Sequence, residues 1–498
     1  MSTPLSKPLR WPRAPGGAFA RHVVTLASGT AIAQLLLVLA TPVLTRLYTP
    51  ADYGVLAVYS STLTVLLVLA TLRYETAIPL PEDEEVAGSL LALTLLVVAG
   101  ATVVVALLVW LLGDAFVART RVTALGPYLW LMPVGLLGAG TYQALSYWAI
   151  RRRAFGRIAR TRLSQGTGQV VSQVGFGLAG VGAPGLLVGD VIGRVAGGGG
   201  LAILAFRDHP FGRVTGASLA SAAARYRRFP LLTTWSGLLN VGSLQLPSIL
   251  FSAGFGAAAA GLYALSYKML VLPTMLVGQA VGQVFLARAA TLSREPERLR
   301  QITERTALAL FACGLPVFGA VALGGPQLFA TVMGSQWEQA GRYAQALAPW
   351  FAVWLVSNPL SGLLSVREWQ GSALVFAAFE FALRLGALLI GTSRGSPMLA
   401  VALLSASGVI ISVTSIARFL HAGHSSISHL LDPAARLLAL ATACFLPAAA
   451  ALYAGSARLA IGAGALAIAG YYLVVLRSDT ATRILHLRRD VPVPTAAP

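Results

Sequence analysis

Long apolar runs recur along almost the whole chain, separated by short polar segments. Each run holds roughly 20 residues, the length at which an α-helix crosses the hydrocarbon core of a bilayer. The pattern predicts an all-α, polytopic membrane protein with about 14 spanning helices. The predicted spans lie near 22–45, 53–80, 86–112, 123–148, 163–182, 184–206, 229–253, 258–285, 306–324, 343–366, 372–391, 395–417, 437–454 and 459–476.

Composition agrees with this pattern, because 56% of the residues are hydrophobic and only 11% are charged. The formal net charge of +19 sits mostly in the short loops between apolar runs, where it acts as a topology signal; we therefore predict no nucleic-acid partner. Cys313 and Cys444 lie inside apolar runs, so we expect inert thiols and no metal. No nucleotide-binding glycine loop, serine elbow or paired-carboxylate loop is present, so we predict no cofactor and no enzymatic activity.

The distribution of Lys and Arg predicts the orientation, since these residues concentrate on the cytoplasmic side. With the N-terminus inside, the predicted cytoplasmic tails and loops hold 27 such residues and the outside loops hold six. Both termini are therefore expected in the cytoplasm. The outside cations are Arg46, Arg119, Arg121, Arg342, Arg394 and Arg458.

A weak internal repeat divides the chain. Pro42 is followed twelve residues later by Gly54 in ADYGVLAVY, and Pro247 is followed fourteen residues later by Gly261 in AAAGLYALSY. This indicates a parallel repeat of six helices each. The basic connection between the halves is expected to link them, and it also has the character of an amphipathic surface segment. The predicted parts are a basic tail over 1–21, a first lobe over 22–206, a linker over 207–228, a second lobe over 229–420, two further helices over 433–477 and a tail over 478–498.

Two pairs of opposite charges lie inside predicted spans at a spacing of i to i+4. Asp190 with Arg194, and Glu380 with Arg384, can each form an ion pair on one helix face. Their role is either structural, in helix packing, or the arginines face a cavity; the spacing leaves both open.

Three further charges in predicted spans have no such partner. Arg73 and Glu75 are two residues apart and so point to different sides of a helix. Lys268 lies about ten residues into its span, roughly 15 Å deep and near the midplane of the bilayer. An unpaired cation at that depth indicates a hydrated cavity that receives an anion, and pairing with an acid on another helix is the alternative. We place Arg73 towards the cytoplasmic end of the same cavity, and Glu75 is either its partner or a protonatable group for ion coupling.

Uncharged polar residues mark the expected cavity walls. Gln34 in the first span and Asn240 and Gln245 in the seventh suit sugar hydroxyls, and hydrogen bonding between helices is the alternative. Four aromatic residues near the start of the tenth span favour an aromatic belt first and a sugar platform second: Trp337, Tyr343, Trp350 and Trp354. A glutamine stripe at every fourth position of the fifth span fits either a seam within the lobe or a cavity wall: Gln165, Gln169 and Gln173.

The stretch RLYTPADYGVLAVYSSTLTVLLVLATLRYETAIPLPEDEE at 46–85 resembles bacterial polysaccharide-biosynthesis membrane proteins of the O-antigen flippase type. These share a superfamily with the multidrug and toxic-compound extrusion transporters and the lipid II flippase. The similarity continues loosely through SQGTGQVVSQVGFGLAG and GLYALSYKM. It implies two six-helix bundles around a V-shaped cavity, in which cations meet a diphosphate. Arg73 and Glu75 fall in the matching LRYE stretch and Lys268 in GLYALSYKM, while Arg194 and Arg384 are carried over only as charges.

The expected function follows from this resemblance. It implies alternating-access transport of an undecaprenyl-diphosphate-linked oligosaccharide to the outer leaflet of the bacterial cytoplasmic membrane. Proton or sodium coupling, contact with membrane lipids, and polysaccharide polymerase or assembly partners are implied with it. A drug exporter of the same fold is the nearest alternative and would favour acids in the cavity. A membrane polymerase or ligase is the alternative from another class, and it would carry a larger outside loop.

Overall fold

The computed structural model describes residues 16–208, 212, 214–292, 294–363 and 371–477, and the remaining parts of the predicted tails lie outside this range. Its regular structure is entirely helical over the described residues. Eleven of the helices there are long and apolar enough to cross a membrane. The predicted fold class is therefore confirmed. The other three predicted spans are also helices and are long enough to cross a membrane, but they are less apolar than the eleven: α4, α5 and α12.

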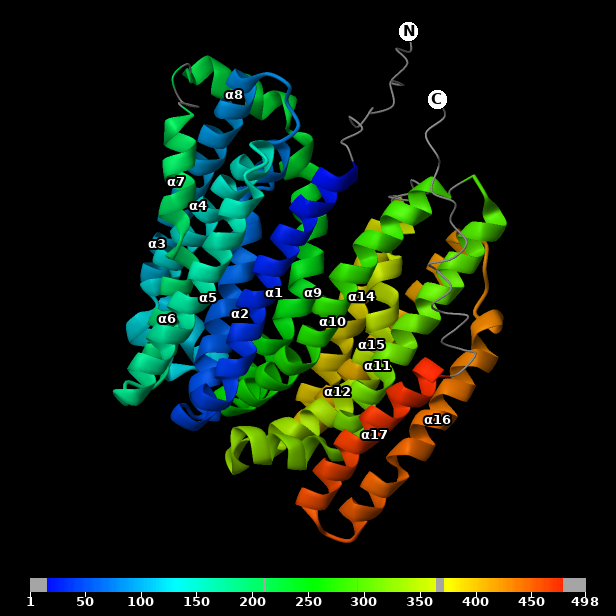
Figure 1. The fold of residues 1–498 in the computed structure, drawn as a ribbon. Coiled ribbons are helices and arrows are strands. Elements are labelled where there is room, and N and C mark those ends of the chain that lie inside the picture. Colours follow the sequence, from blue (N-terminus) through cyan, green and yellow to red (C-terminus); the bar gives the residue numbers. More distant parts are fainter. Residues whose placement is uncertain (1–15, 209–211, 213, 293, 364–370, 478–498) are drawn as a thin grey trace.

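The first group of helices packs mainly on itself, with α5 between α1 and α6, and α4 between α2 and α7. Figure 1 shows this group beside the second one. Its elements are α1 (Gly16–Leu47), α2 (Pro50–Thr71), η1 (Tyr74–Ala77), α3 (Glu84–Thr120), η2 (Thr123–Tyr128), α4 (Leu131–Arg151), α5 (Phe155–Leu178), α6 (Ala183–Val195) and α7 (Gly198–Arg207). The connecting segment forms α8 (Gly216–Arg225), which packs on α3.

The second group is built around α12, which packs on α10, α11 and α15. Its elements are η3 (Phe229–Thr233), α9 (Thr234–Phe255), α10 (Ala257–Thr291), α11 (Pro296–Met333), η4 (Ser335–Trp337), α12 (Glu338–Leu360), α14 (Gly371–Ser393) and α15 (Pro397–Ala422). The last two helices pack on each other and on α11, at the outer side of this group (Figure 1). They are α16 (Ser428–Tyr453) and α17 (Ala457–Arg477).

The start of α2 follows from its sequence. Thr49 is the N-cap, and its hydroxyl accepts from the backbone N–H of Asp52 at 3.2 Å. In return the Asp52 carboxylate accepts from the Thr49 N–H at 2.9 Å. Pro50 occupies the first turn, where its missing N–H costs nothing. This reciprocal cap fixes the direction in which α2 enters the bundle.

The predicted end of this span at residue 80 is wrong. Helix α2 ends at Thr71, and Leu72 and Arg73 both adopt left-handed backbone angles, with φ of 46° and 60°. A separate turn, η1, then carries Glu75. The sequence has no Gly or Pro at this break to signal it. The unfavourable backbone is held by tertiary contacts, because the turn buries Glu75 against Gln143 of α4.

Two other predicted spans are also divided. The span near 184–206 consists of α6 and α7, which separate at Gly197, where φ is +79°. Glycine tolerates this angle, and a Cβ there would lie 3.0 Å from the backbone of Thr161 in α5. The span near 123–148 begins as the short helix η2 before α4 starts at Leu131. Apolar content alone does not register such breaks, since the residues on both sides are hydrophobic.

The two groups meet closely at one end of the molecule, where α1 turns into α2 and α9 into α10. Gly54 of α2 and Gly261 of α10 form the crossing point: a Cβ at Gly54 would lie 1.8 Å from the Ala257 carbonyl oxygen, and one at Gly261 would lie 1.9 Å from the Pro50 carbonyl oxygen. Only glycine allows backbones to approach so far. These are the two glycines of the internal repeat, so each half contributes the same feature to the contact.

Polar contacts join the groups at the same end. The indole N–H of Trp337 donates to the Thr45 carbonyl oxygen at 2.8 Å. On the other side, the Ser252 hydroxyl donates to the Thr120 carbonyl oxygen at 2.6 Å. Together with the glycine crossing, these contacts close one end of the space between the two groups. We call this region the closed end.

Candidate functional site

A cavity of about 770 Å³ lies between the two groups of helices. Its wall is formed by α2, α5 and α6 on one side and by α9, α10, α12, α14 and α15 on the other. At the end away from the glycine crossing, the lining residues Asn240 and Met275 are exposed. The volume is in the range of small-molecule and cofactor sites, and the wall mixes apolar and polar side chains.

Of the charged residues inside predicted spans and the amides predicted to bind sugar hydroxyls, six line this cavity. They come from the four helices α6, α9, α10 and α14: Asp190, Asn240, Gln245, Lys268, Glu380 and Arg384. Four others of that set do not line it: Gln34, Arg73, Glu75 and Arg194. The folding of the two halves against each other therefore brings together most, but not all, of the predicted set.

Lys268 is the charge in this wall that has no counter-ion. It lies in α10, twelve residues from the helix start, and forms no hydrogen bond or ion pair with any residue that the structure describes. Asp190 is the acid near enough to interact with it electrostatically. Asp190, however, already binds the Arg194 guanidinium at 2.6 Å. Lys268 thus leaves one uncompensated positive charge in the cavity.

The second charged pair lies on α14. Arg384 Nη2 and the Glu380 carboxylate are 2.7 Å apart, and the guanidinium also lies 4.7 Å from the centre of the Trp350 ring. The Arg384 side chain is 3% exposed, and its Nε and Nη1 atoms have no hydrogen-bond partner among the described residues. The spacing-based prediction of both ion pairs is confirmed. Of the two arginines, Arg384 lines the cavity and Arg194 does not.

Arg73 and Glu75 lie outside the cavity, where α2 ends. The Glu75 side chain is fully buried, and the Gln143 amide donates to its Oε1 at 2.8 Å, whereas Oε2 has no partner in the described part of the chain. Burial raises the pKa of Glu75 above its ordinary value, with smaller opposing effects from hydrogen bonds and Arg73. The Arg73 guanidinium reaches across to the second group, where it lies against Gly237 of α9.

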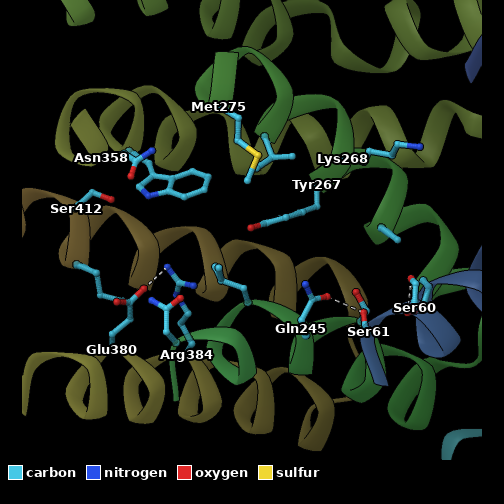
Figure 2. Close-up of a pocket in the computed structure, with 18 of the residues that line it drawn as sticks. Ser60, Ser61, Gln245, Tyr267, Lys268, Met275, Asn358, Glu380, Arg384 and Ser412 are labelled. Carbon is cyan, nitrogen blue, oxygen red and sulfur yellow. Dashed lines mark hydrogen bonds and ion pairs between the residues drawn. The ribbon is translucent and has the colours of Figure 1, made fainter. Parts of the chain in front are cut away.

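Small hydroxyl residues form much of the wall, and no sequence pattern predicts them there. Ser60 and Ser61 lie on α2, and the Ser61 hydroxyl donates to Gln245 Oε1 of α9 at 3.0 Å, a bond that joins the two groups (Figure 2). Ser412 of α15 and Asn358 of α12 line the opposite wall. A single serine in an apolar run carries no helical periodicity, so only the fold identifies these positions.

The aromatic-belt prediction is wrong for three of its four residues. Trp337, Tyr343 and Trp350 are buried within the protein, because α12 is the central helix of its group. Trp354 instead lines the cavity, together with Tyr267. The glutamine stripe of α5 serves both suggested purposes. Gln165 and Gln173 bond to backbone carbonyls of α6, and Gln169 lines the cavity.

Comparison with known proteins identifies the family of this chain. A family model described as "Polysaccharide biosynthesis protein" matches residues 43–342. "Lipopolysaccharide biosynthesis protein WzxC" of Escherichia coli (strain K12) is 24% identical over 174 residues, which cover 35% of this chain and 35% of that relative's length. The chain therefore matches only about a third of this relative.

Two solved structures share the fold. "Lipid II flippase MurJ, inward closed conformation" aligns with a TM-score of 0.67 at 10% identity, covering 92% of this chain and 100% of that one. The inward-facing conformation of a multidrug resistance MATE family transporter of the MOP superfamily aligns with a TM-score of 0.53 at 15% identity, covering 84% and 94%. The chain belongs to the polysaccharide biosynthesis protein family and has a fold that flippases and multidrug transporters share.

Proposed function

We propose that this protein is a flippase that moves an undecaprenyl-diphosphate-linked oligosaccharide from the cytoplasmic to the outer leaflet of the bacterial cytoplasmic membrane. The observation that carries this proposal is Lys268, the charge in the cavity wall without a counter-ion among the described residues. A cation within a membrane protein is stabilised by an anionic ligand, and a diphosphate supplies one. The family and the names of the relatives support polysaccharide synthesis as the setting.

The charges in the cavity wall distinguish a flippase for an anionic cargo from an exporter of cationic drugs. Its two acids are Asp190 and Glu380, and each already binds an arginine. A cationic drug would have to displace one of those arginines, whereas an anion meets Lys268 directly. The cavity therefore favours an anionic cargo. A polymerase or ligase is disfavoured because the proteins that share this fold are named as transporters.

Alternating access requires the two lobes, taken as 22–206 and 229–420, to separate at the closed end. We propose that this end faces outwards, as the distribution of Lys and Arg predicts, with both termini in the cytoplasm. The π-helical turn η3, Phe229–Thr233, begins α9 and is the natural place for bending, since π-turns often mark functional sites. The Arg73 guanidinium lies across this joint against Gly237, where it packs between the two lobes.

Glu75 is our candidate for proton coupling. Its buried carboxylate has one unpartnered oxygen among the described residues and lies at the junction between α2 and α3. Release of the proton leaves a negative charge that favours exposure or a closer contact with Arg73, so protonation can bias the position of the turn. We expect Glu75→Gln to make export insensitive to collapse of the proton gradient. A variant that stays as gradient-dependent as the parent would exclude Glu75 from coupling.

The direct test of the proposed function is depletion of the protein, followed by measurement of the leaflet in which lipid-linked oligosaccharide accumulates. We expect accumulation on the cytoplasmic face. Accumulation on the outer face would overturn the flippase proposal and favour an enzyme or a later assembly partner.

Lys268 provides the matching test at the level of one residue. We expect Lys268→Ala to abolish export at a normal protein level and Lys268→Arg to keep part of it, because the arginine retains the charge. Arg342→Ala is the control, since it removes one exposed cation that pairs with Glu338 and with no other described residue, outside the cavity. Full export by the alanine variant would remove Lys268 from substrate binding.

A further inference from the structure

The wall of the cavity that belongs to the second group carries an unusual arrangement on α14. Glu380 and Arg384 form a pair with no net charge, yet the pair is incompletely bonded. The buried Arg384 guanidinium keeps Nε and Nη1 without partners in the described chain, and it lines the cavity. A buried donor that lacks an acceptor has lost its hydrogen bonds to water without a replacement. The arrangement is therefore costly unless a ligand completes it.

The surroundings of this pair identify the kind of ligand. Figure 2 shows Tyr267 with its hydroxyl directed towards Arg384, and Asn358 and Ser412 on the same side of the cavity. Tyr267 is near enough to interact electrostatically with both charged groups. Lys268 points away from this set, towards the other part of the cavity. The wall thus offers fixed hydrogen-bond donors and acceptors beside aromatic rings and away from the unpaired charge.

We propose that this wall is a subsite for a neutral, hydroxyl-rich sugar ring of the cargo. Two neighbouring sugar hydroxyls can form hydrogen bonds with both members of the pair: one hydroxyl donates to the Glu380 carboxylate, and the other accepts from the Arg384 guanidinium. The Trp354 and Tyr267 rings cover an apolar face of the sugar. Asn358 contributes an amide, which can donate and accept in the same way. This inference rests on the proposed function and assigns a second part of its cavity.

The electrostatics favour a neutral sugar over an acidic one at this position. An added carboxylate would lie close to the Glu380 carboxylate, and the one cation present is already neutralised by that group. A free metal cation is equally disfavoured, because the guanidinium occupies the position beside Glu380. The cavity therefore separates two tasks: Lys268 meets the diphosphate, and the Glu380–Arg384 pair binds the sugar attached to it.

Binding of short synthetic cargo analogues to the purified, detergent-solubilised protein tests this division. The probes are farnesyl diphosphate alone and farnesyl diphosphate bearing glucose, galactose, mannose, N-acetylglucosamine or glucuronic acid. We expect at least one neutral sugar to tighten binding about tenfold or more, as charge-assisted hydrogen bonds allow. The double variant Glu380→Gln with Arg384→Gln should lose this gain and keep its affinity for farnesyl diphosphate. Lys268→Gln should lose affinity for every probe by the same factor.

The outcomes distinguish the two proposals. Equal binding of the bare diphosphate and all four neutral-sugar probes would overturn the sugar subsite and leave the flippase proposal standing. The subsite would also be overturned if glucuronic acid gave the largest gain and the double variant removed that gain. Failure of the parent protein to bind any diphosphate would instead count against the proposed function.

A second variant keeps the test decisive if the double variant does not fold. Asn358→Ala breaks no ion pair and changes a residue that faces the cavity. We expect it to lower the gain from the neutral sugar without changing the affinity for farnesyl diphosphate. An unchanged gain would overturn the proposal.

Discussion

The glycine crossing at the closed end allows a sharp prediction about the conformational cycle. A Cβ at Gly54 would lie 1.8 Å from the Ala257 carbonyl oxygen, and ordinary van der Waals contact begins at 3.4 Å. To admit the methyl group of Gly54→Ala, α2 and α10 must therefore move apart by about 1.6 Å. Neither side of this contact is a flexible side chain, so the backbone itself has to shift.

The energetic consequence follows from the cost of overpacking, about 1 to 3 kcal/mol per inserted methyl group. The clash exists only in the conformation in which α2 and α10 touch, so the methyl group destabilises that conformation alone. The ratio of closed to open molecules should drop about 5- to 150-fold. Gly261→Ala should act in the same way, because its Cβ would lie 1.9 Å from the Pro50 carbonyl oxygen.

Cysteine labelling from outside the cell measures this shift. With Cys313 and Cys444 replaced by alanine, Ser248→Cys places one thiol in the cavity wall, inward of the closed end. A membrane-impermeant maleimide reaches it from outside only when the closed end opens. We expect labelling to be about tenfold faster or more in the Gly54→Ala background. Export should fall at the same time, since the protein spends less time open to the cytoplasm.

Gly100→Ala is the matched control, because a Cβ at Gly100 in α3 has nothing within 4 Å. It should change neither labelling nor export. If Gly54→Ala folds, exports normally and labels at the parental rate, the reasoning from the closed end is refuted. The crossing would then be a packing detail that both conformations tolerate.

Three further predictions concern single side chains. Trp337→Phe removes the indole donor to the Thr45 carbonyl oxygen at the closed end, and we expect a loss of about 1 kcal/mol in closed-state stability, seen as faster labelling of the same cysteine. Glu75→Gln should flatten the pH dependence of the melting temperature above pH 4.5. Because burial raises the pKa of Glu75 in the folded state, the parent loses stability as the pH rises from the unfolded-state pKa to the folded-state pKa. An identical pH dependence in the variant would contradict this assignment. Arg194→Gln leaves Asp190 free to pair with Lys268, so diphosphate binding should weaken, whereas the conservative Arg194→Lys should retain it. Unchanged binding in the glutamine variant would show that Arg194 is not what keeps Asp190 from neutralising Lys268.

The sequence predicts which charged residues form ion pairs more accurately than it predicts which of them line the cavity. Asp190 with Arg194 and Glu380 with Arg384 pair as predicted, because the spacing of i to i+4 is a property of any helix. Arg73 was expected in the cavity because its helix was expected to continue. The left-handed turn at Leu72 and Arg73 moves it onto α9 instead. No local residue signals that turn, so spacing along a helix gave the wrong position.

By itself the sequence determined the helical, membrane-spanning character of this protein and the two glycines of its repeat. Hydrophobicity acts over a single run of residues, so each predicted span overlaps at least one helix of the described chain. Only the tertiary structure decided which polar side chains share a cavity, since Ser61 meets Gln245 across 184 residues of chain. It also buried Trp350 while it exposed Trp354 to the cavity. Such choices depend on how helices pack against one another, and packing arises between segments that no local pattern connects.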